Sequence, residues 1–181
     1  MLVDEFGSLP SVLRASRSSL AKLLPEYPLA CEMILATRAA MLKSLQVDLQ
    51  AKPILSSSRA VIDYLFAHLA HEPAEQVRVL YLDAKNRLLR DDIAIRGTVD
   101  RADIFPREII RRALDLGASG LVLAHNHPSG DPSPSPADLR MTQVVVEAAK
   151  WFDIILYDHI IVGRTGHVSL RAKGGLFEKS L

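Results

Sequence analysis

The chain has 181 residues, a formal net charge of +1 and 24% charged residues. This length suits one domain with a small additional segment, because domains usually hold roughly 100 to 200 residues. The composition, with 49% hydrophobic residues, excludes a mainly disordered or coiled-coil chain, and the balanced charge gives no global attraction to nucleic acid or anionic lipid.

Residues 1–52 are expected to form a helical hairpin that differs from the rest of the chain. Apolar residues recur at helical spacing on both sides of a break at Pro25–Pro28. Lys52, Pro53 and the serines Ser56–Ser58 then mark a boundary, so we expect a second domain over residues 53–181. Its first element is a helix from about Arg59 to Ala70, capped by one of these serines.

The second domain is expected to be α/β (α+β), a mixed sheet flanked by helices. From Glu75 apolar residues alternate with polar ones, and a turn near Asn86 predicts an antiparallel hairpin that ends at Ile95. The remaining expected elements, in chain order, are a helix over Asp103–Leu116 closed by Gly117, a buried strand over Gly120–Ala124, a helix from Pro136 to about Phe152, and strands over Ile154–Gly163 and Val168–Leu170.

We expect a cytoplasmic protein that does not enter a membrane. The longest apolar runs are far shorter than the roughly 20 residues that span a bilayer. The start of the chain, with Asp4 and Glu5, lacks the basic and apolar regions of a signal peptide. The single cysteine, Cys31, cannot form an internal disulfide and is expected to be a buried free thiol.

A pattern suited to metal binding follows the buried strand. His125 and His127 stand where that strand runs into a proline-rich loop, and Asp138 lies in the first turn of the next helix. Histidines two residues apart project from the same side of a strand. Two imidazoles and a carboxylate are a common ligand set for catalytic zinc, which leaves a fourth position for water and lowers the pKa of that water to about 7. We therefore predict one zinc ion per chain.

Two further residues have a candidate catalytic role, each with a structural alternative. Ser135 begins a capping box with Asp138, yet its hydroxyl could also donate to a developing oxyanion. Glu75, at the start of the first strand, could act as the general base, although an acid there is usually a solvated rim residue. Glu72 and Glu108 compete with Glu75 for this role.

The other histidines are weaker candidates as ligands. His68 and His71 share a helix face and are expected at the surface. His159 lies in an apolar strand, which favours either a core histidine or a hydrogen-bond partner of a ligand. His167 follows a glycine turn and is expected to be exposed.

These residues resemble a known family. His125-x-His127, seven residues, Ser135, two residues and Asp138, with an upstream glutamate, is similar to the JAMM (MPN+) metalloprotease signature. The sequence His-Asn-His-Pro-Ser-Gly-Asp-Pro resembles that of RadC proteins within that group, and the resemblance covers about Glu75–Phe177. The resemblance implies that His125, His127 and Asp138 bind zinc, that Glu75 activates the water and that Ser135 is the oxyanion donor. It also implies hydrolysis of peptide or isopeptide bonds on an MPN-type mixed sheet.

The sequence departs from the family in two places. Asn126 replaces the Ser or Thr of deubiquitinating relatives, so a ubiquitin-like substrate is not implied. Phe6-Gly7-Ser8-Leu9 resembles the start of the helix-hairpin-helix that RadC proteins usually carry, but Pro25-Glu26-Tyr27-Pro28 occupies the place of its glycines. Proline has no amide donor and Glu26 repels phosphate, which argues against DNA binding by this segment.

Three functions remain open at this point: a zinc-dependent peptidase or isopeptidase, a DNA-repair-associated protein that binds or processes nucleic acid, and an inactive scaffold. The loop after His127 holds Asp131 and no Lys or Arg before Arg140, which disfavours a nuclease. A zinc nucleobase deaminase is excluded, since its His-x-Glu and Pro-Cys-x-x-Cys pattern is missing.

Overall fold

The computed structural model describes residues 2–54, 58–96 and 105–174. Contacts divide the chain into two compact units, residues 1–47 and 48–181, so the division falls inside helix α4 (Pro28–Ala51). Within the described ranges, no helix combines the length and the apolar character that a membrane span requires.

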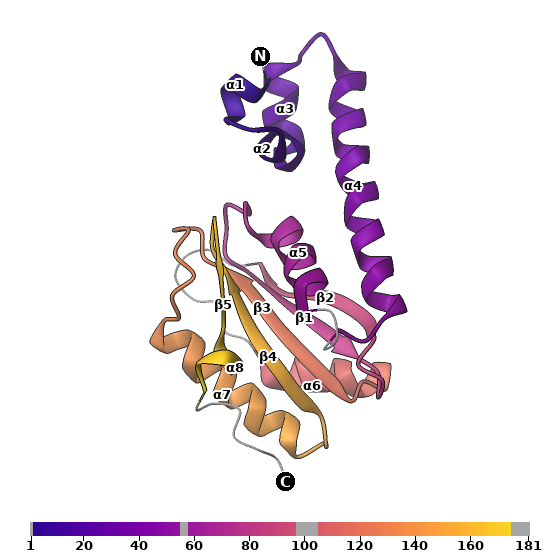
Figure 1. Ribbon diagram of the computed structural model, residues 1–181, viewed down its shortest axis with the longest axis vertical. Coiled ribbons are helices and arrows are strands. Elements are labelled where there is room, and N and C mark those ends of the chain that lie inside the picture. The colour runs from indigo at the N-terminus through magenta and orange to yellow at the C-terminus, as the bar shows by residue number, and fades with distance from the viewer. Residues whose placement is uncertain (1, 55–57, 97–104, 175–181) are drawn as a thin grey trace. The chain divides into compact units, whose positions relative to one another are not determined.

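The first unit holds four helical segments where the sequence predicts a two-helix hairpin. They are α1 (Leu2–Phe6), α2 (Leu9–Arg14), α3 (Arg17–Leu23) and the long α4 (Figure 1). Serine caps explain the extra breaks: Ser8 accepts a hydrogen bond from the Ser11 amide at 3.2 Å, and Ser16 accepts one from the Ser19 amide at 3.0 Å. The buried residues of this unit include Leu20 and the free thiol of Cys31.

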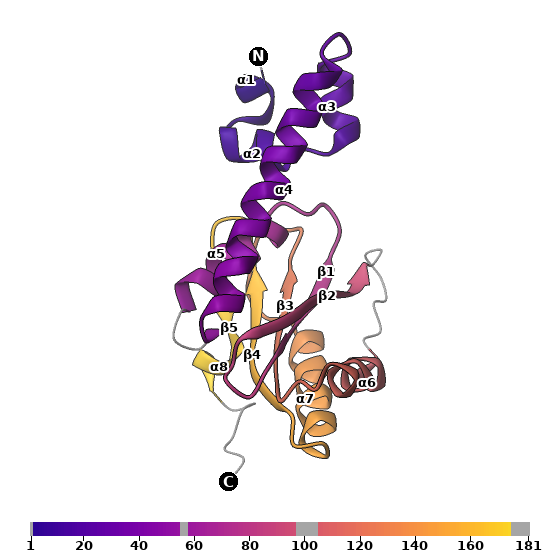
Figure 2. The same ribbon diagram turned by 90° about the vertical axis from the view of Figure 1, so that its right-hand side faces the viewer.

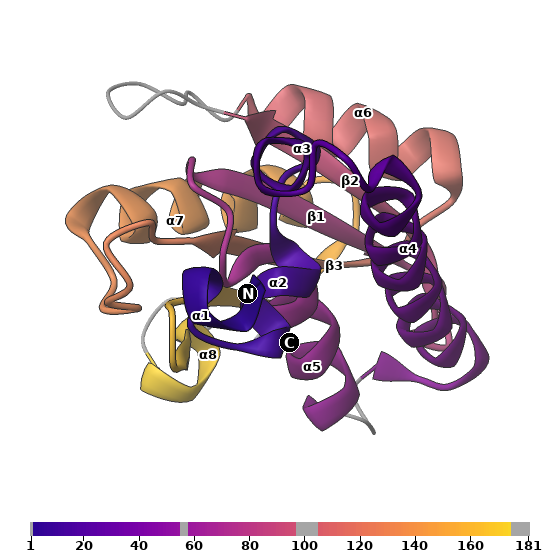
Figure 3. The same cartoon turned by 90° about the horizontal axis from the view of Figure 1, so that it is seen from above.

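The second unit is a five-stranded sheet with helices on both faces, as the sequence predicts. Its elements are α5 (Ser58–Leu69), β1 (Gln76–Leu82), β2 (Leu88–Arg96), α6 (Pro106–Leu116), β3 (Gly120–Asn126), α7 (Pro136–Lys150), β4 (Ile155–Val162), β5 (His167–Ser169) and α8 (Leu170–Lys173). The strand order is β2-β1-β3-β4-β5, and only β3 and β4 run parallel. Helices α6 and α7 cover one face, and α5 covers the other (Figures 2 and 3).

Two local expectations concern residues outside the described ranges. The serine cap of α5 was expected at Ser56–Ser58, of which Ser56 and Ser57 are not described. Asp103, the expected first residue of helix α6, is also outside the described ranges. At its other end α6 is followed by Gly117 with φ of +63°, the left-handed conformation that favours glycine.

The central strand β3 is buried at every position, because it has strands on both sides and helices on both faces. Leu121 and Leu123 pack with β1 and with the inner faces of α6 and α7. Burying such a side chain contributes about 1.5 to 3 kcal/mol relative to exposure. The well-packed strand then ends at His125 and Asn126, which places the next residues at a fixed end of the core.

A buried ion pair within the sheet is linked by a hydrogen bond to α5, on the face of the sheet away from α6 and α7. Arg78 of β1 binds Asp91 of β2, with 2.7 Å between Nη2 and Oδ2, and the two side chains are only 9% and 1% exposed. The hydroxyl of Tyr64 in α5 also donates to Asp91. Burial and the nearby Asp91 charge raise the pKa of Tyr64, so its hydroxyl stays protonated as the donor.

We expect Arg78→Met to lower the free energy of unfolding by about 3 to 5 kcal/mol, because Asp91 would keep a buried charge without its partner. Denaturant unfolding monitored by circular dichroism measures this. The control is Arg59→Met, which removes an exposed ion pair with Asp63 on α5 and should change stability much less. Equal effects of the two substitutions would contradict the importance of the buried pair.

Candidate metal centre

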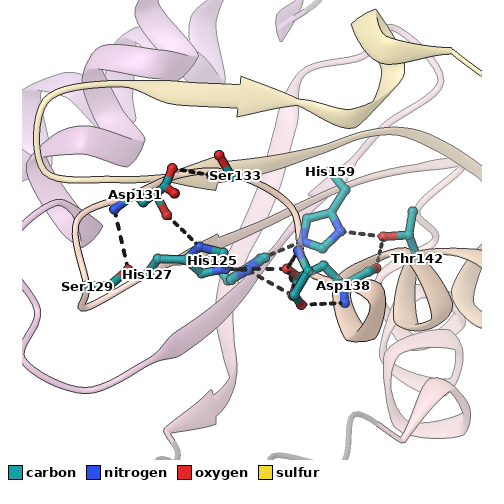
Figure 4. A network of polar contacts seen from close by, with 9 residues as sticks. His125, His127, Ser129, Asp131, Ser133, Asp138, Thr142 and His159 are labelled. Atoms are coloured by element: carbon teal, nitrogen blue, oxygen red, sulfur yellow. Dashed lines mark hydrogen bonds and ion pairs between the residues drawn. The ribbon is translucent and has the colours of Figure 1, made fainter.

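Three side chains, from a strand, the loop after it and the next helix, converge at the end of β3. His125 is the penultimate residue of this strand, His127 begins the loop that follows, and Asp138 lies in the first turn of α7 (Figure 4). His125 Nε2 is 3.0 Å from His127 Nε2 and 3.2 Å from Asp138 Oδ1, and His127 Nε2 is 3.4 Å from Asp138 Oδ2. The predicted ligands therefore form a group that could hold a metal ion.

These separations fit a tetrahedral ion. Zinc lies about 2.0 to 2.1 Å from imidazole nitrogen and a similar distance from carboxylate oxygen. Ligand atoms at tetrahedral corners around such an ion are then about 3.3 to 3.4 Å apart. The separations of 3.0 Å between His125 and His127 and 3.2 Å between His125 and Asp138 Oδ1 are close to this spacing, and one ligand atom from each of the three residues lies within 4.8 Å of the others. The donor set, two nitrogens and one oxygen, is also one that catalytic zinc uses.

A backbone carbonyl sets the orientation of the His127 ring. His127 Nδ1 lies 2.7 Å from the carbonyl oxygen of Asp131, which can only accept a hydrogen bond. Nδ1 must therefore carry a proton, and in the neutral ring Nε2 keeps its lone pair. The Asp131 side chain accepts from the Ser133 amide at 2.9 Å, so the loop that supplies the carbonyl is itself held (Figure 4).

Ser135 binds Asp138 in the expected capping box. The amide and the hydroxyl of Ser135 each donate to Asp138 Oδ2 at 2.7 Å, and the amide of Asp138 donates back to Ser135 Oγ at 3.2 Å. These bonds leave Asp138 with a fixed carboxylate that points at the histidines. They also occupy the hydroxyl proton of Ser135, so its role as an oxyanion donor would need this proton to turn away from Asp138.

The charge of Asp138 shapes the electrostatics of the group. Burial would raise the pKa of Asp138, but its close contacts with His125 and His127 and the hydrogen bond from Ser135 hold this pKa well below its usual range. The contact with Asp138 also raises the pKa of His127, and the Asp131 carbonyl and the charge of Glu75 raise it further. Burial of the ring lowers this pKa, but by less. The carboxylate is thus ionised and available to a cation.

Glu75 lies directly before β1, on the strand next to the histidines. Val77 pairs with His125 in the antiparallel register of β1 and β3, so continuing this register places Glu75 opposite His127. Glu75 is half-buried, and its charge contributes to the raised pKa of His127. The competitor Glu108 instead lies exposed on α6, where it pairs with Arg111 at 3.0 Å.

Asn126 fixes the chain segment that carries Glu75. Its side chain points to the opposite side of β3 from His125, since successive residues of a strand alternate. Asn126 Oδ1 accepts from the Gln76 amide at 2.9 Å, and Nδ2 donates to the carbonyls of Glu72 and Ala74, each at 3.1 Å. Asn126 is only 2% exposed, and both its oxygen and its nitrogen are hydrogen-bonded to the backbone of this segment. The sequence alone shows Asn126 only as a departure from relatives, because its partners lie about 50 residues away along the chain.

The loop after His127 rests against the turn between β4 and β5. The His127 amide donates to the Val162 carbonyl at 3.0 Å, and the Arg164 amide donates to the Gly130 carbonyl at 3.0 Å. A Cβ on Gly163 would lie 2.4 Å from the Gly130 oxygen, so only glycine allows this approach. The side chain of Arg164 lies beside Gly130, which brings a positive charge to a loop that has none in its own sequence.

His159 of β4 joins the site, as one of its two sequence interpretations allowed. The ring is fully buried, and its Nε2 lies 2.8 Å from His125 Nδ1. Burial, with the neighbouring His125, lowers the pKa of His159 to about 3, so this ring is neutral. A register shift in β4 turns it inward: Leu121 pairs with Leu156 and Val122 with Asp158, so Tyr157 is an extra residue.

The comparisons with known proteins identify the family of this chain. The family model described as "RadC-like JAB domain" matches residues 55–176. The chain belongs to the RadC family. A relative in Rhodobacter capsulatus, named UPF0758 protein, is 42% identical over 173 residues, which cover 96% of this chain and 81% of that protein. Membership of the RadC family confirms the resemblance drawn from the His125-x-His127 pattern, and the name of the relative states no activity.

We expect His127→Ala to weaken zinc binding by more than about 100-fold, because one of three ligands is lost. Competition against a chromogenic chelator measures the affinity. The exposed His167, which is outside the three-residue group, supplies the control His167→Ala. Zinc binding that is unchanged in His127→Ala would exclude this residue as a ligand.

Gly163→Ala is expected to displace the loop that carries His127, and so to lower zinc affinity and reduce stability by about 1 to 3 kcal/mol through overpacking. Chelator competition and thermal unfolding give the two values. Gly166→Ala is the matched control, because a Cβ at Gly166 meets nothing within 4 Å. If Gly163→Ala behaves like this control, the close contact does not position the loop.

Proposed function

We propose that this RadC-family protein is a zinc-dependent hydrolase of the JAMM type that cleaves peptide or isopeptide bonds. The observation that carries the proposal is the convergence of His125, His127 and Asp138, whose ligand atoms lie within 4.8 Å of one another, next to a glutamate that directly precedes the adjacent strand. Zinc bound there would supply Lewis acidity and acidify a water molecule in the open position.

Glu75 would serve as the general base. It would accept the proton that the attacking water loses and return a proton to the nitrogen of the leaving amine, so that the proton count balances over the reaction. Its position supports this role, since the β1 register brings it opposite His127 and Asn126 fixes the backbone on both sides of it. A base placed in this way contributes roughly 100- to 10,000-fold to a rate.

Ser135 would donate to the oxyanion that forms on the substrate carbonyl. Its place at the N-terminus of α7, beside the carboxylate ligand, supports this role. The hydroxyl proton would have to exchange Asp138 Oδ2 for the substrate oxygen. In that state the Ser135 amide would still hold Asp138 at 2.7 Å, so the carboxylate keeps its orientation while the hydroxyl turns.

We predict that Glu75→Gln retains zinc but lowers hydrolysis by at least about 100-fold, because the amide cannot accept a proton. Peptides, isopeptides and DNA are offered in parallel to the zinc-loaded protein, and products are separated by mass spectrometry and gel electrophoresis. The control is Glu108→Gln, which alters only an exposed carboxylate on α6.

The outcomes separate the candidate functions. Cleavage of peptides or isopeptides that is lost in Glu75→Gln and kept in Glu108→Gln supports the proposal. Cleavage of DNA alone would favour nucleic-acid processing. A protein that binds no zinc and cleaves none of the three would be a scaffold, and a Glu75→Gln variant as active as the wild type would remove Glu75 from the mechanism.

A further inference from the structure

A chain of three hydrogen bonds runs from His125 to the backbone of Asp138. His125 Nδ1 lies 2.8 Å from His159 Nε2, His159 Nδ1 lies 2.5 Å from Thr142 Oγ1, and this hydroxyl lies 2.6 Å from the carbonyl oxygen of Asp138 (Figure 4). His125, His159 and Thr142 are each 0% exposed. Each group in the chain is therefore satisfied by its neighbours and is shielded from bulk water.

The last acceptor determines the direction of every bond in this chain. A backbone carbonyl can only accept, so the single hydroxyl proton of Thr142 points to Asp138. Thr142 Oγ1 must then accept from His159, which places the His159 proton on Nδ1 and leaves a lone pair on Nε2. His159 Nε2 in turn accepts from His125, so His125 carries its proton on Nδ1.

This direction leaves the lone pair of His125 on Nε2, the atom that faces His127 and Asp138. The tautomer of His127 is set in the same sense, because its Nδ1 donates directly to the Asp131 carbonyl at 2.7 Å. Both histidines thus have their outer nitrogen bound, directly or through a relay, to a backbone carbonyl. In the neutral rings both inner nitrogens then present a lone pair within the group that they form with Asp138.

We propose that His159 and Thr142 are positioning residues that fix the tautomer and the ring orientation of His125 for metal binding. The inference rests on the metal-binding part of the proposed function. Neither residue is one of the three ligands. They act through His125, and through the backbone of the residue that supplies the carboxylate.

The fold brings these two residues to His125 by separate means. Thr142 lies one helical turn after Asp138 in α7, so the helix that delivers the carboxylate also delivers the hydroxyl on the same face. His159 reaches the same face of the sheet because Tyr157 is an extra residue in β4. Gly120 makes room for this, since a Cβ there would lie 2.4 Å from the Tyr157 ring.

Thr142→Val and Thr142→Ser form a matched pair of variants. Valine keeps nearly the shape of threonine but removes the hydroxyl, so His159 Nδ1 loses its acceptor and the ring can adopt the other tautomer. His159 would then donate to His125 Nδ1, which moves the His125 proton to the inner nitrogen. We expect Thr142→Val to weaken zinc binding about 10- to 100-fold, and Thr142→Ser to stay close to the wild type.

His159→Gln and His159→Leu give an independent pair if Thr142→Val fails to fold. The glutamine amide offers an acceptor for His125 and a donor for Thr142, whereas leucine offers neither. Chelator competition should rank zinc affinity as wild type, then His159→Gln, then His159→Leu. Equal affinity for His159→Leu and the wild type would overturn the proposal.

A spectroscopic readout tests the tautomer without metal. Long-range nitrogen–proton correlation NMR of the metal-free protein at about pH 8 distinguishes the two protonated ring nitrogens. The expected result is a proton on His125 Nδ1 in the wild type and in Thr142→Ser, with the other tautomer appearing in Thr142→Val. A wild-type proton on His125 Nε2 would overturn the relay.

The two readouts distinguish the inference from the proposed function. A wild type that binds no zinc contradicts the proposed function, and the NMR result alone then decides whether the relay orients His125. A wild type that binds zinc, with Thr142→Val equal to it in affinity and in tautomer, contradicts the inference and leaves the proposed function intact.

Discussion

The candidate metal group depends on one constraint: two imidazole nitrogens and one carboxylate oxygen must present lone pairs to a common point. Each of the three side chains is held by hydrogen-bond partners outside the group. The Asp131 carbonyl holds His127, the relay through His159 and Thr142 holds His125, and the amide of Ser135 holds Asp138. Such pre-orientation reduces the ordering that an incoming ion would otherwise have to impose.

Alternation at the end of the central strand makes successive residues face opposite sides of the sheet. His125 and His127 face the metal group, while Asn126 faces the other side and binds the backbone around Ala74 and Gln76. The strand that carries the ligands is thus tied directly to the segment that carries Glu75. In the proposed mechanism this tie keeps the base and the ligands at a constant separation.

The sequence predicts those parts of the site that arise from local rules. The three candidate ligands are predicted by strand alternation and by their place in the first turn of a helix, and the Ser135 cap is predicted by a short local motif. The order of elements after Glu75 follows from hydrophobic periodicity and from Gly117 at a helix end. The predicted fold class and family are accordingly confirmed.

Other features depend on contacts between distant segments, which no local pattern reports. The extra residue Tyr157 changes which side chains of β4 face the site, so the sequence alone left two interpretations of His159 open, a core histidine or a hydrogen-bond partner of His125 or another ligand. The capping serines Ser8 and Ser16 could have indicated that the first unit has more helices than a hairpin. The approach of Arg164 to Gly130 requires the turn between β4 and β5 to fold back on the loop, which places one positive charge beside a loop that has none in its own sequence.

The most direct test of this account is X-ray absorption at the zinc edge on protein purified without chelators and supplied with zinc. The account predicts about one ion per chain, bound by two imidazole nitrogens and about two oxygens at about 2.0 to 2.1 Å. A protein without stoichiometric zinc, or an ion whose surroundings contain no imidazole, would contradict it.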